Sequence, residues 1–224
     1  MTHKAKIDGE QHLLPLKIKF KQMKNKKVFM LLNGAEPKIF PDLSGYDLVC
    51  AIDGAYNHFK LKNIMPDLVT GDFDSIHAIP GNIEVINTPD QNFTDFDKAL
   101  SILKNRGYIH IDVYGGSGKE HDHFLGNIST ALQWKNSLKI SFFDDFGTYF
   151  FIEEQITLTN VKGRNISLIP FPIAYEIFTE GLAYPIVNET LTFGKRIGTR
   201  NIAFHNEVQI SFKGGELLVY VSNI

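Results

Sequence analysis

The sequence is poor in cysteine and in long hydrophobic runs. Cys50 is its only cysteine and has no intrachain partner for a disulfide, so we expect a buried structural thiol in the apolar run 48–52 and nothing that requires an oxidising compartment. The longest early apolar run, 28–32, is too short to span a bilayer, and the lysine-rich N-terminus lacks the apolar core of a signal peptide. We therefore expect a cytoplasmic protein with no membrane contact.

The sequence also lacks an excess of charge of either sign. Its 23 lysines and arginines nearly balance 25 aspartates and glutamates, and the net charge of -2 provides no broad attraction to nucleic acid. The basic stretch 17–27 carries alternating apolar residues, and we interpret it as a solvated strand or an extension rather than a nucleic-acid arm. Any ligand that carries phosphate must therefore be held by a few local side chains.

Short apolar runs alternate with amphipathic stretches over the first two thirds of the chain, which is typical of a parallel sheet covered by helices. We expect strands at 28–33, 47–53, 67–70, 83–87, 109–114 and 139–143. Helices are expected from Thr94, whose hydroxyl can cap the first turn, to Gly107, and over 122–135. The conformation of 34–45, which contains two prolines, stays open. The predicted fold class is α/β, with a mostly parallel sheet flanked by helices in a Rossmann-like three-layer arrangement.

The pattern changes after about residue 146. Short β-rich runs follow one another at 148–152, 155–158, 166–170, 202–204, 207–212 and 217–221, with turn signals between them. No long helical pattern interrupts these runs, so we expect an all-β sandwich. The predicted organisation is an N-terminal extension at 1–26, an α/β domain at 27–146 and a β-sandwich domain at 147–224.

Seven aspartates lie between positions 53 and 97, and two of them are separated by a single residue. In an extended backbone, Asp72 and Asp74 point to the same side, with their carboxylates roughly 6 to 7 Å apart. Two such anions repel by about 2 to 3 kcal/mol at an effective dielectric constant of ~20. The stretch itself offers only Lys60 and Lys62 as cations, both in an expected helix. A hard divalent cation, Mg²⁺ bridging to a polyphosphate, is the simplest counter-charge.

Polar residues also follow the other expected strands, at the edge where the carboxyl ends of parallel strands meet. They include Asn33, the Asp53-Gly54 pair, the run 89–95 and the glycine-rich run 115–119. Each has a purely structural interpretation as well. Asp53-Gly54 is a common turn, and the glycines alone fit an ordinary strand-to-helix loop. Successive exposed amides followed by a lysine at a helix start would, however, suit phosphate oxygens.

Two further groups have weaker functional signals. Asp95 suits the first turn of a helix on structural grounds alone, and we expect Asp97 to be the more exposed surface group of the two. His121, Asp122 and His123 suggest a metal site, but neighbouring side chains at a helix start do not all face one ion. For Asp122 we favour a helix cap or a nucleotide contact.

The order and spacing of these motifs resemble the thiamine pyrophosphokinase family. The resemblance is carried by 53–55, 66–75, 91–100 and 122–127, and more loosely by 167–170, 181–185 and 198–201. It implies an α/β catalytic domain that binds ATP, a β-sandwich domain that binds thiamine, and a homodimer with active sites at the subunit interface. The reaction it implies is the Mg²⁺-dependent transfer of pyrophosphate from ATP to thiamine, giving thiamine diphosphate and AMP.

The resemblance also implies roles for individual residues. Asp72, Asp74 and Asp95 are assigned to Mg²⁺, to the triphosphate and to catalysis, with Asp95 the candidate acceptor of the thiamine hydroxyl proton. The nucleotide is expected to contact Asn33, Asp53, Gly54, Thr94, Lys119 and Asp122. Thiamine is expected to contact Gln91 and Asn201, the latter from the other subunit.

Two residues depart from the family pattern and keep alternatives open. Glu120 stands where the family usually has arginine, so Lys119 is the candidate for that phosphate contact, and Arg200 stands where serine is usual before Asn201. Because of these two charges, a non-catalytic protein that binds a nucleotide or thiamine phosphate is an alternative function for this chain. A nucleotide-sugar transferase would also use Asp72 and Asp74 but gives no reason for 91–95.

Overall fold

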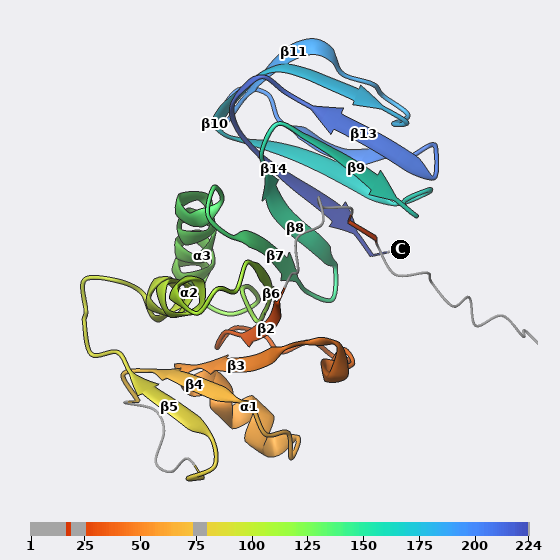
Figure 1. Ribbon diagram of the computed structural model, residues 1–224. Helices are drawn as coiled ribbons and strands as arrows, with labels where there is room; N and C mark the ends of the chain where they lie inside the picture. Colours follow the sequence, from red (N-terminus) through yellow and green to blue (C-terminus); the bar gives the residue numbers. More distant parts are fainter. Residues whose placement is uncertain (1–16, 19–25, 74–79, 224) are drawn as a thin grey trace, which may run out of the picture.

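The fold is taken from a computed structural model, which describes residues 17–18, 26–73 and 80–223 (Figure 1). Its parallel strands lie in the order β5-β4-β3-β2-β6-β7, and each neighbouring pair is parallel. They are β2 (Lys27–Leu31), β3 (Leu48–Ile52), β4 (Leu68–Gly71), β5 (Glu84–Asn87), β6 (His110–Tyr114) and β7 (Lys139–Phe143). The six expected strands of this region are therefore confirmed to within a few residues.

Strand β3, in the middle of the parallel strands, is apolar at every position because both of its faces are covered. In β3, the side chain of Cys50 packs on the face covered by α2 (Asp95–Asn105) and α3 (His121–Trp134), whereas Ala51 packs on the face covered by α1 (Tyr56–Leu61). Figure 1 shows α2 and α3 on one side of these strands and α1 on the other. Cys50 is fully buried, as the sequence predicted.

The helix at α2 begins and ends where the sequence signals predict. Thr94 is its N-cap, and the Thr94 hydroxyl accepts a hydrogen bond from the amide of Asp97 at 3.2 Å. Phe96, Leu100 and Leu103 are buried against the sheet. Gly107, with φ +80°, follows the helix in the left-handed conformation that glycine adopts without strain.

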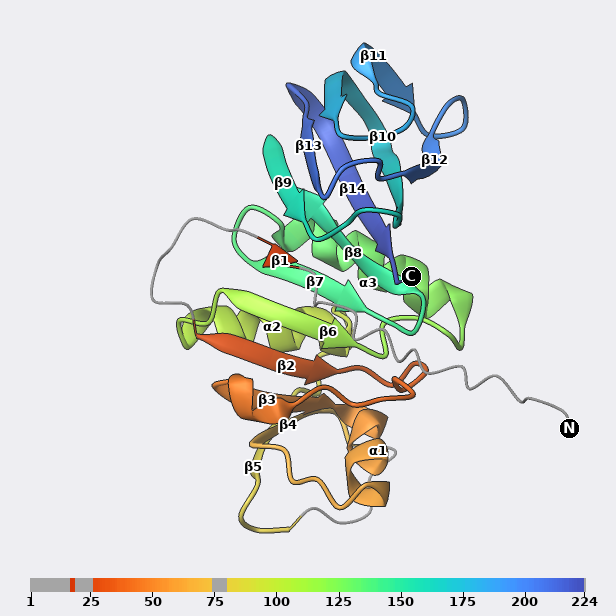
Figure 2. The ribbon, with the colours of Figure 1, turned by 90° about the vertical axis from the view of Figure 1, so that its right-hand side faces the viewer.

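The remaining strands are antiparallel and continue the same sheet. They are β1 (Lys17–Ile18), β8 (Gly147–Ile152), β9 (Gln155–Thr159), β10 (Asn165–Glu180), β11 (Val187–Thr192), β12 (Gly198–Ile202), β13 (Glu207–Ser211) and β14 (Gly214–Ser222). Strand β8 pairs with β7 on one side and with β14 on the other. In Figure 2 the antiparallel strands β9 to β14 lie in the upper part of the view, above the parallel strands. No helix occurs among the described residues from 147 to 223.

The α/β prediction is confirmed, but the sheet mixes parallel and antiparallel strands. The fold as a whole is largely β, with few helices. The mixture arises at β8, whose two antiparallel pairings join the parallel strands to a second group of strands with its own buried cluster around Leu158, Leu168 and Val219. In the part of the chain that the structure describes, every helix is too short or too polar to span a bilayer.

Candidate active site

A cleft of about 640 Å³ lies at the carboxyl ends of the parallel strands. Its walls come from the ends of β2, β3 and β6, from the loop 88–95 and from the start of α3. Seven of the residues predicted from the sequence line it together: Asn33, Asp53, Gln91, Thr94, Asp95, Lys119 and Asp122. The expectation that separate strand ends form one polar surface is therefore confirmed for these seven residues.

Asp53 and Gly54 directly follow β3 and have different roles. Asp53 lines the cleft with φ +43°, a backbone conformation that aspartate adopts more readily than most residues. Gly54 is buried and does not line the cleft. A Cβ atom at Gly54 would lie 2.6 Å from Nδ2 of Asn33, so the glycine allows the Asn33 side chain to approach. The structure thus assigns Gly54 to packing beneath the cleft, because its surface is covered by Asn33.

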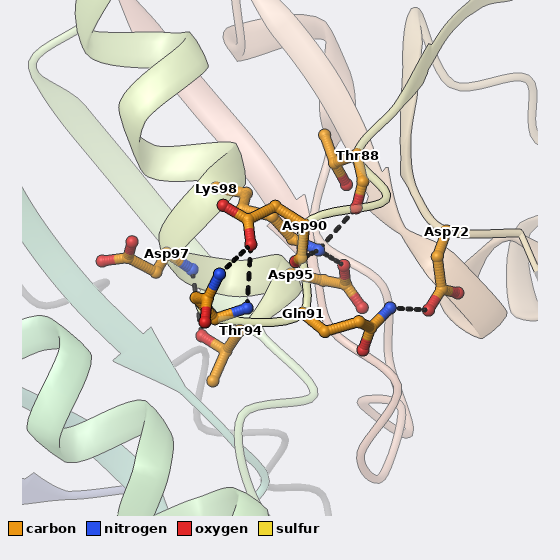
Figure 3. A network of polar contacts seen from close by, with 9 residues as sticks. Asp72, Thr88, Asp90, Gln91, Thr94, Asp95, Asp97 and Lys98 are labelled. Carbon is orange, nitrogen blue, oxygen red and sulfur yellow. Dashed lines mark hydrogen bonds and ion pairs between the residues drawn. The ribbon is translucent and has the colours of Figure 1, made fainter.

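Asp72 follows β4 and contacts the loop 88–95 (Figure 3). The Gln91 side-chain amide donates a hydrogen bond to Oδ2 of Asp72 at 3.2 Å. The strand ends at Gly71, and Phe73 has φ +63°, so the extended geometry expected for 72–74 is wrong. The turn is accompanied by packing of the Phe73 ring on the cluster beside α1. Asp74 lies outside the described residues.

Asp95 is paired with a lysine that the sequence analysis did not consider as a cation. Nζ of Lys98 lies 2.7 Å from Oδ1 of Asp95, one turn along α2. The same ammonium donates hydrogen bonds to the carbonyl oxygens of Thr88 at 2.6 Å and Asp90 at 2.9 Å. The signal available in the sequence was the i, i+3 spacing of an acid and a base at the start of a predicted helix. Lys62, which the sequence analysis did count, pairs with Glu36 at 3.4 Å.

The glycine-rich run 115–118 packs its backbone directly on the end of β2. The amides of Gly34 and Ala35 donate to the carbonyl oxygens of Gly115 and Ser117 at 2.9 and 2.8 Å. A Cβ atom at Gly34 would lie 2.2 Å from the Gly115 oxygen, so a side chain would separate the two segments. The glycines therefore have a packing role, and Gly115, Gly116 and Ser117 also line the cleft.

Lys119 and the first residues of α3 bring charge of both signs to the cleft. Nζ of Lys119 donates to the backbone oxygen of Asn33 at 2.8 Å. Glu120 pairs with His123 at 3.1 Å, and Oδ1 of Asp122 accepts the His123 amide at 2.8 Å. The described residues contain no group of three or more His, Cys, Asp and Glu side chains placed to hold a metal, so His121, Asp122 and His123 do not form such a group.

Besides the buried Phe96, two aromatic side chains that were not predicted as site residues line the cleft. Phe93 is 54% exposed, and Phe124 packs edge-on against Tyr149 with ring centroids 6.2 Å apart. Both offer an apolar face to a flat ligand ring. Phe124 could not be told from a core phenylalanine, because it lies on the apolar face of a predicted helix, whereas the polar neighbours of Phe93 in the run 89–95 were a signal that could have identified it.

Asn201 does not line the cleft of its own chain. It lies on β12, where its side chain exchanges hydrogen bonds with the backbone of Tyr184, accepting from the amide at 3.1 Å and donating to the carbonyl at 2.5 Å. Tyr184 and Phe204 nearby are 74% and 66% exposed. Arg200 is also exposed, with φ +55°, and its amide donates to Oγ of Ser167 at 3.0 Å.

The sequence matches two family descriptions, one after the other along the chain. "Thiamin pyrophosphokinase, catalytic domain" matches residues 42–142, and "Thiamin pyrophosphokinase, vitamin B1 binding domain" matches residues 153–217. The chain is 29% identical over 210 residues to a thiamine pyrophosphokinase of Bacillus subtilis, which covers 86% of this chain and 97% of that protein. It is 28% identical over 168 residues to thiamin pyrophosphokinase 1 of Caenorhabditis elegans, which covers 67% of this chain and 69% of that protein.

Solved structures give the same result for the fold. The crystal structure of thiamine pyrophosphokinase from Bacillus subtilis superposes with a TM-score of 0.76 at 27% identity, covering 88% of this chain and 99% of that one. A thiamin pyrophosphokinase family protein from Enterococcus faecalis reaches a TM-score of 0.78 at 19% identity, covering 88% and 99%. At that identity the second likeness shows the shared fold alone.

Proposed function

The chain belongs to the thiamine pyrophosphokinase family, whose reaction transfers pyrophosphate from ATP to thiamine, and we propose that the cleft described above is where this chain performs it. The observation that supports this placement is the gathering of seven predicted site residues, from four separate segments of the chain, around one cavity. A cavity of about 640 Å³ lies within the size range of small-molecule sites.

The nucleotide side of the cleft is proposed to be the wall formed by Asn33, Asp53, Thr94, Lys119 and Asp122. Lys119 lies between the glycine-rich run 115–118 and the first turn of the 14-residue helix α3, and all three segments line the cleft. A helix N-terminus and a lysine both favour the negative charge of phosphate oxygens. Glu120 brings a carboxylate to the same wall, so we propose that Lys119 supplies the positive charge that the departure at position 120 removes.

Mg²⁺ is proposed to bind between the triphosphate and the carboxylates of Asp72, Asp74 and Asp95. The described part of this donor set suits the ion, because Asp72 and Asp95 offer hard oxygen atoms and Mg²⁺ usually binds one or two carboxylates while keeping water and phosphate ligands. When bound, the ion would neutralise charge on the transferred phosphates. Gln91 is proposed to contact thiamine while it holds Asp72, and Asp95 to accept the proton from the thiamine hydroxyl.

A second copy of the chain is proposed to supply Asn201. The support is that Asn201 lies away from its own cleft and beside exposed apolar side chains, Tyr184, Ile202 and Phe204. Apolar side chains of this kind are buried when two copies associate. The proposed assembly is a homodimer in which each active site contains residues of both subunits.

The predicted domain organisation and cellular location are also proposed to hold for this chain. The parallel strands with helices on both faces would form a Rossmann-like unit at 27–146, and the antiparallel strands a sandwich at 147–224, after an extension at 1–26. The protein is expected to act in the cytoplasm, without nucleic acid or membrane partners.

A non-catalytic binding protein is the alternative that Glu120 and Arg200 favour. Incubation with ATP, thiamine and Mg²⁺, followed by identification of the products, separates the two. Thiamine diphosphate with AMP supports the proposed reaction, whereas binding of ATP without any product supports the alternative. ADP with thiamine monophosphate would show that the wrong phosphorus atom is attacked.

A further inference from the structure

We propose that Lys98 is a positioning residue whose ammonium group fixes the loop 88–95, and through it the places of Asp95 and Gln91 in the cleft. This inference rests on the function proposed above, because Asp95 and Gln91 are there assigned to the reaction. Lys98 itself is not assigned to any ligand.

The Lys98 ammonium contacts three oxygen atoms, two through hydrogen bonds and one in an ion pair (Figure 3). Two are the backbone oxygens of Thr88 and Asp90, and the third is Oδ1 of Asp95. The side chain is only 11% exposed, so water competes little for these contacts. Its contacts are those of a support for the loop.

The loop 88–95 is a segment that needs such a support. Residues 89–94 are exposed to solvent, and the contact between Asn92 and Asp90 is internal to the loop. Gln91 projects from its middle to Asp72. The Lys98 ammonium contacts the start of the loop, at Thr88 and Asp90, and its end, at Asp95. One positive charge therefore holds the two ends of the loop together.

The ion pair also orients the Asp95 carboxylate. Its Oδ1 atom is buried and paired with Lys98, whereas the side chain as a whole is 30% exposed and lines the cleft. The exposed part of the carboxylate therefore lies on the side of the other oxygen. Reaction rates in such sites depend strongly on the placement of charged groups, so a loss of this orientation is expected to reduce turnover.

Lys104 offers a matched control on the same helix. Its ammonium donates to Oγ of Ser137 at 2.7 Å and lies 5.4 Å from the centre of the Trp134 ring. Like Lys98 it joins α2 to another segment, but it does not line the cleft and does not contact the loop. Lys104→Met thus removes a lysine contact from α2 without disturbing Asp95.

The test compares Lys98→Met and Lys104→Met in two measurements. Amide hydrogen exchange of residues 90–93 is expected to accelerate at least about 10-fold in Lys98→Met and to change less than about 2-fold in Lys104→Met. The kcat for thiamine diphosphate formation is expected to fall at least about 30-fold in Lys98→Met, with KM for ATP within about 3-fold, and to stay within about 2-fold in Lys104→Met. Unchanged loop exchange in Lys98→Met, or an equal loss of kcat in both variants, would overturn the proposal.

A chemical rescue separates positioning from general damage to the fold. Cys50 is fully buried, and burial raises the pKa of its thiol, so Lys98→Cys provides the reactive thiol for 2-bromoethylamine. Sulfur attacks the carbon that bears bromine, bromide leaves, and the thioether carries an ammonium at nearly the reach of lysine. Recovery of slow loop exchange and of most of kcat supports the proposal, and alkylation without either recovery contradicts it. If the unaltered protein forms no thiamine diphosphate, the proposed function fails, while the exchange data still test Lys98.

Discussion

The indole nitrogen of Trp134 donates a hydrogen bond to Oδ1 of Asp97 at 2.7 Å, which joins the last turn of α3 to the first turn of α2. The sequence predicts Asp97 to be a surface group, whereas this contact leaves it partly buried between helices. The error has a physical cause: the donor lies 37 positions away, and local helical spacing carries no information about it.

Loss of this contact should destabilise the fold. Replacing Asp97 by Ala removes the charged acceptor of the hydrogen bonds from Trp134 and Gln133 and should lower the free energy of unfolding by at least about 1.5 to 3 kcal/mol. Trp134→Phe should cost a similar amount, and the double variant less than the sum. Urea denaturation of the three variants measures the coupling. Strict additivity would show that the contact contributes nothing in solution.

Asp72→Asn should separate chemistry from folding. Asparagine keeps an oxygen that can accept from Gln91 but loses the charge proposed to bind Mg²⁺, so activity should fall at least about 100-fold. The thermal midpoint should stay nearly unchanged or rise. Asp42→Asn is the control, since Asp42 caps a short turn outside the cleft, and it should leave activity unchanged. A large loss of thermal stability in Asp72→Asn would show that Asp72 holds the structure together instead.

Gly54→Ala should displace Asn33, a residue of the proposed nucleotide wall. The added Cβ would lie 2.6 Å from Nδ2 of Asn33, and the Asn33 backbone oxygen accepts from Lys119. Because Nδ2 is the end of an exposed side chain that can move, we expect little loss of stability but a displaced Asn33 side chain and a rise in KM for ATP. Gly45→Ala is the matched control, because a Cβ there meets no atom within 4 Å. Equal behaviour of the two variants would contradict the role given to Gly54.

Stability should rise with pH across the range in which histidine titrates. Burial lowers the pKa of His58 below its usual value of 6.5, although Glu36 nearby acts in the opposite direction. The unfolded chain therefore binds more protons at this site, so the contribution is complete above pH 6.5 and is lost as the pH falls below it. His58→Gln should flatten the slope of unfolding free energy between pH 5 and 6.5, whereas His205→Gln, whose ring is exposed, should not. Parallel curves for His58→Gln and the unaltered protein would refute this.

The proposed homodimer predicts complementation between two inactive variants. Asp72→Asn and Asn201→Ala each damage both sites of their own dimer, but a mixed dimer has one site with both defects and one with neither. After subunit exchange, equal amounts should recover up to about a quarter of the unaltered activity. No recovery, with mixed dimers shown to form, would place Asn201 outside the partner's site.

Local signals were sufficient for much of the fold. The inner strands of the parallel part follow from buried apolar runs, and α2 follows from the Thr94 cap and the spacing of Phe96, Leu100 and Leu103. Strand β10 was predicted only over 166–170 although it extends to Glu180, because polar residues and prolines interrupt its apolar pattern. Strand β11 was missed because half of its residues are exposed and its sequence carries no clear apolar pattern.

Some residues of the candidate site were likewise predictable from the sequence, and others were not. Residues at strand ends were predictable, because parallel topology brings those ends to one edge. Lys98 was not, since its three acceptors depend on how the loop 88–95 folds back on α2. The packing role of Gly54 likewise depends on Asn33, a residue of a different strand end.

Product analysis by ³¹P NMR during incubation with ATP, thiamine and Mg²⁺ tests the central claim most directly. The proposed reaction predicts that thiamine diphosphate and AMP appear in equal amounts, that no ADP forms, and that Asp72→Asn slows both signals together. Formation of ADP with thiamine monophosphate, or ATP binding without turnover in the unaltered protein, would contradict the claim.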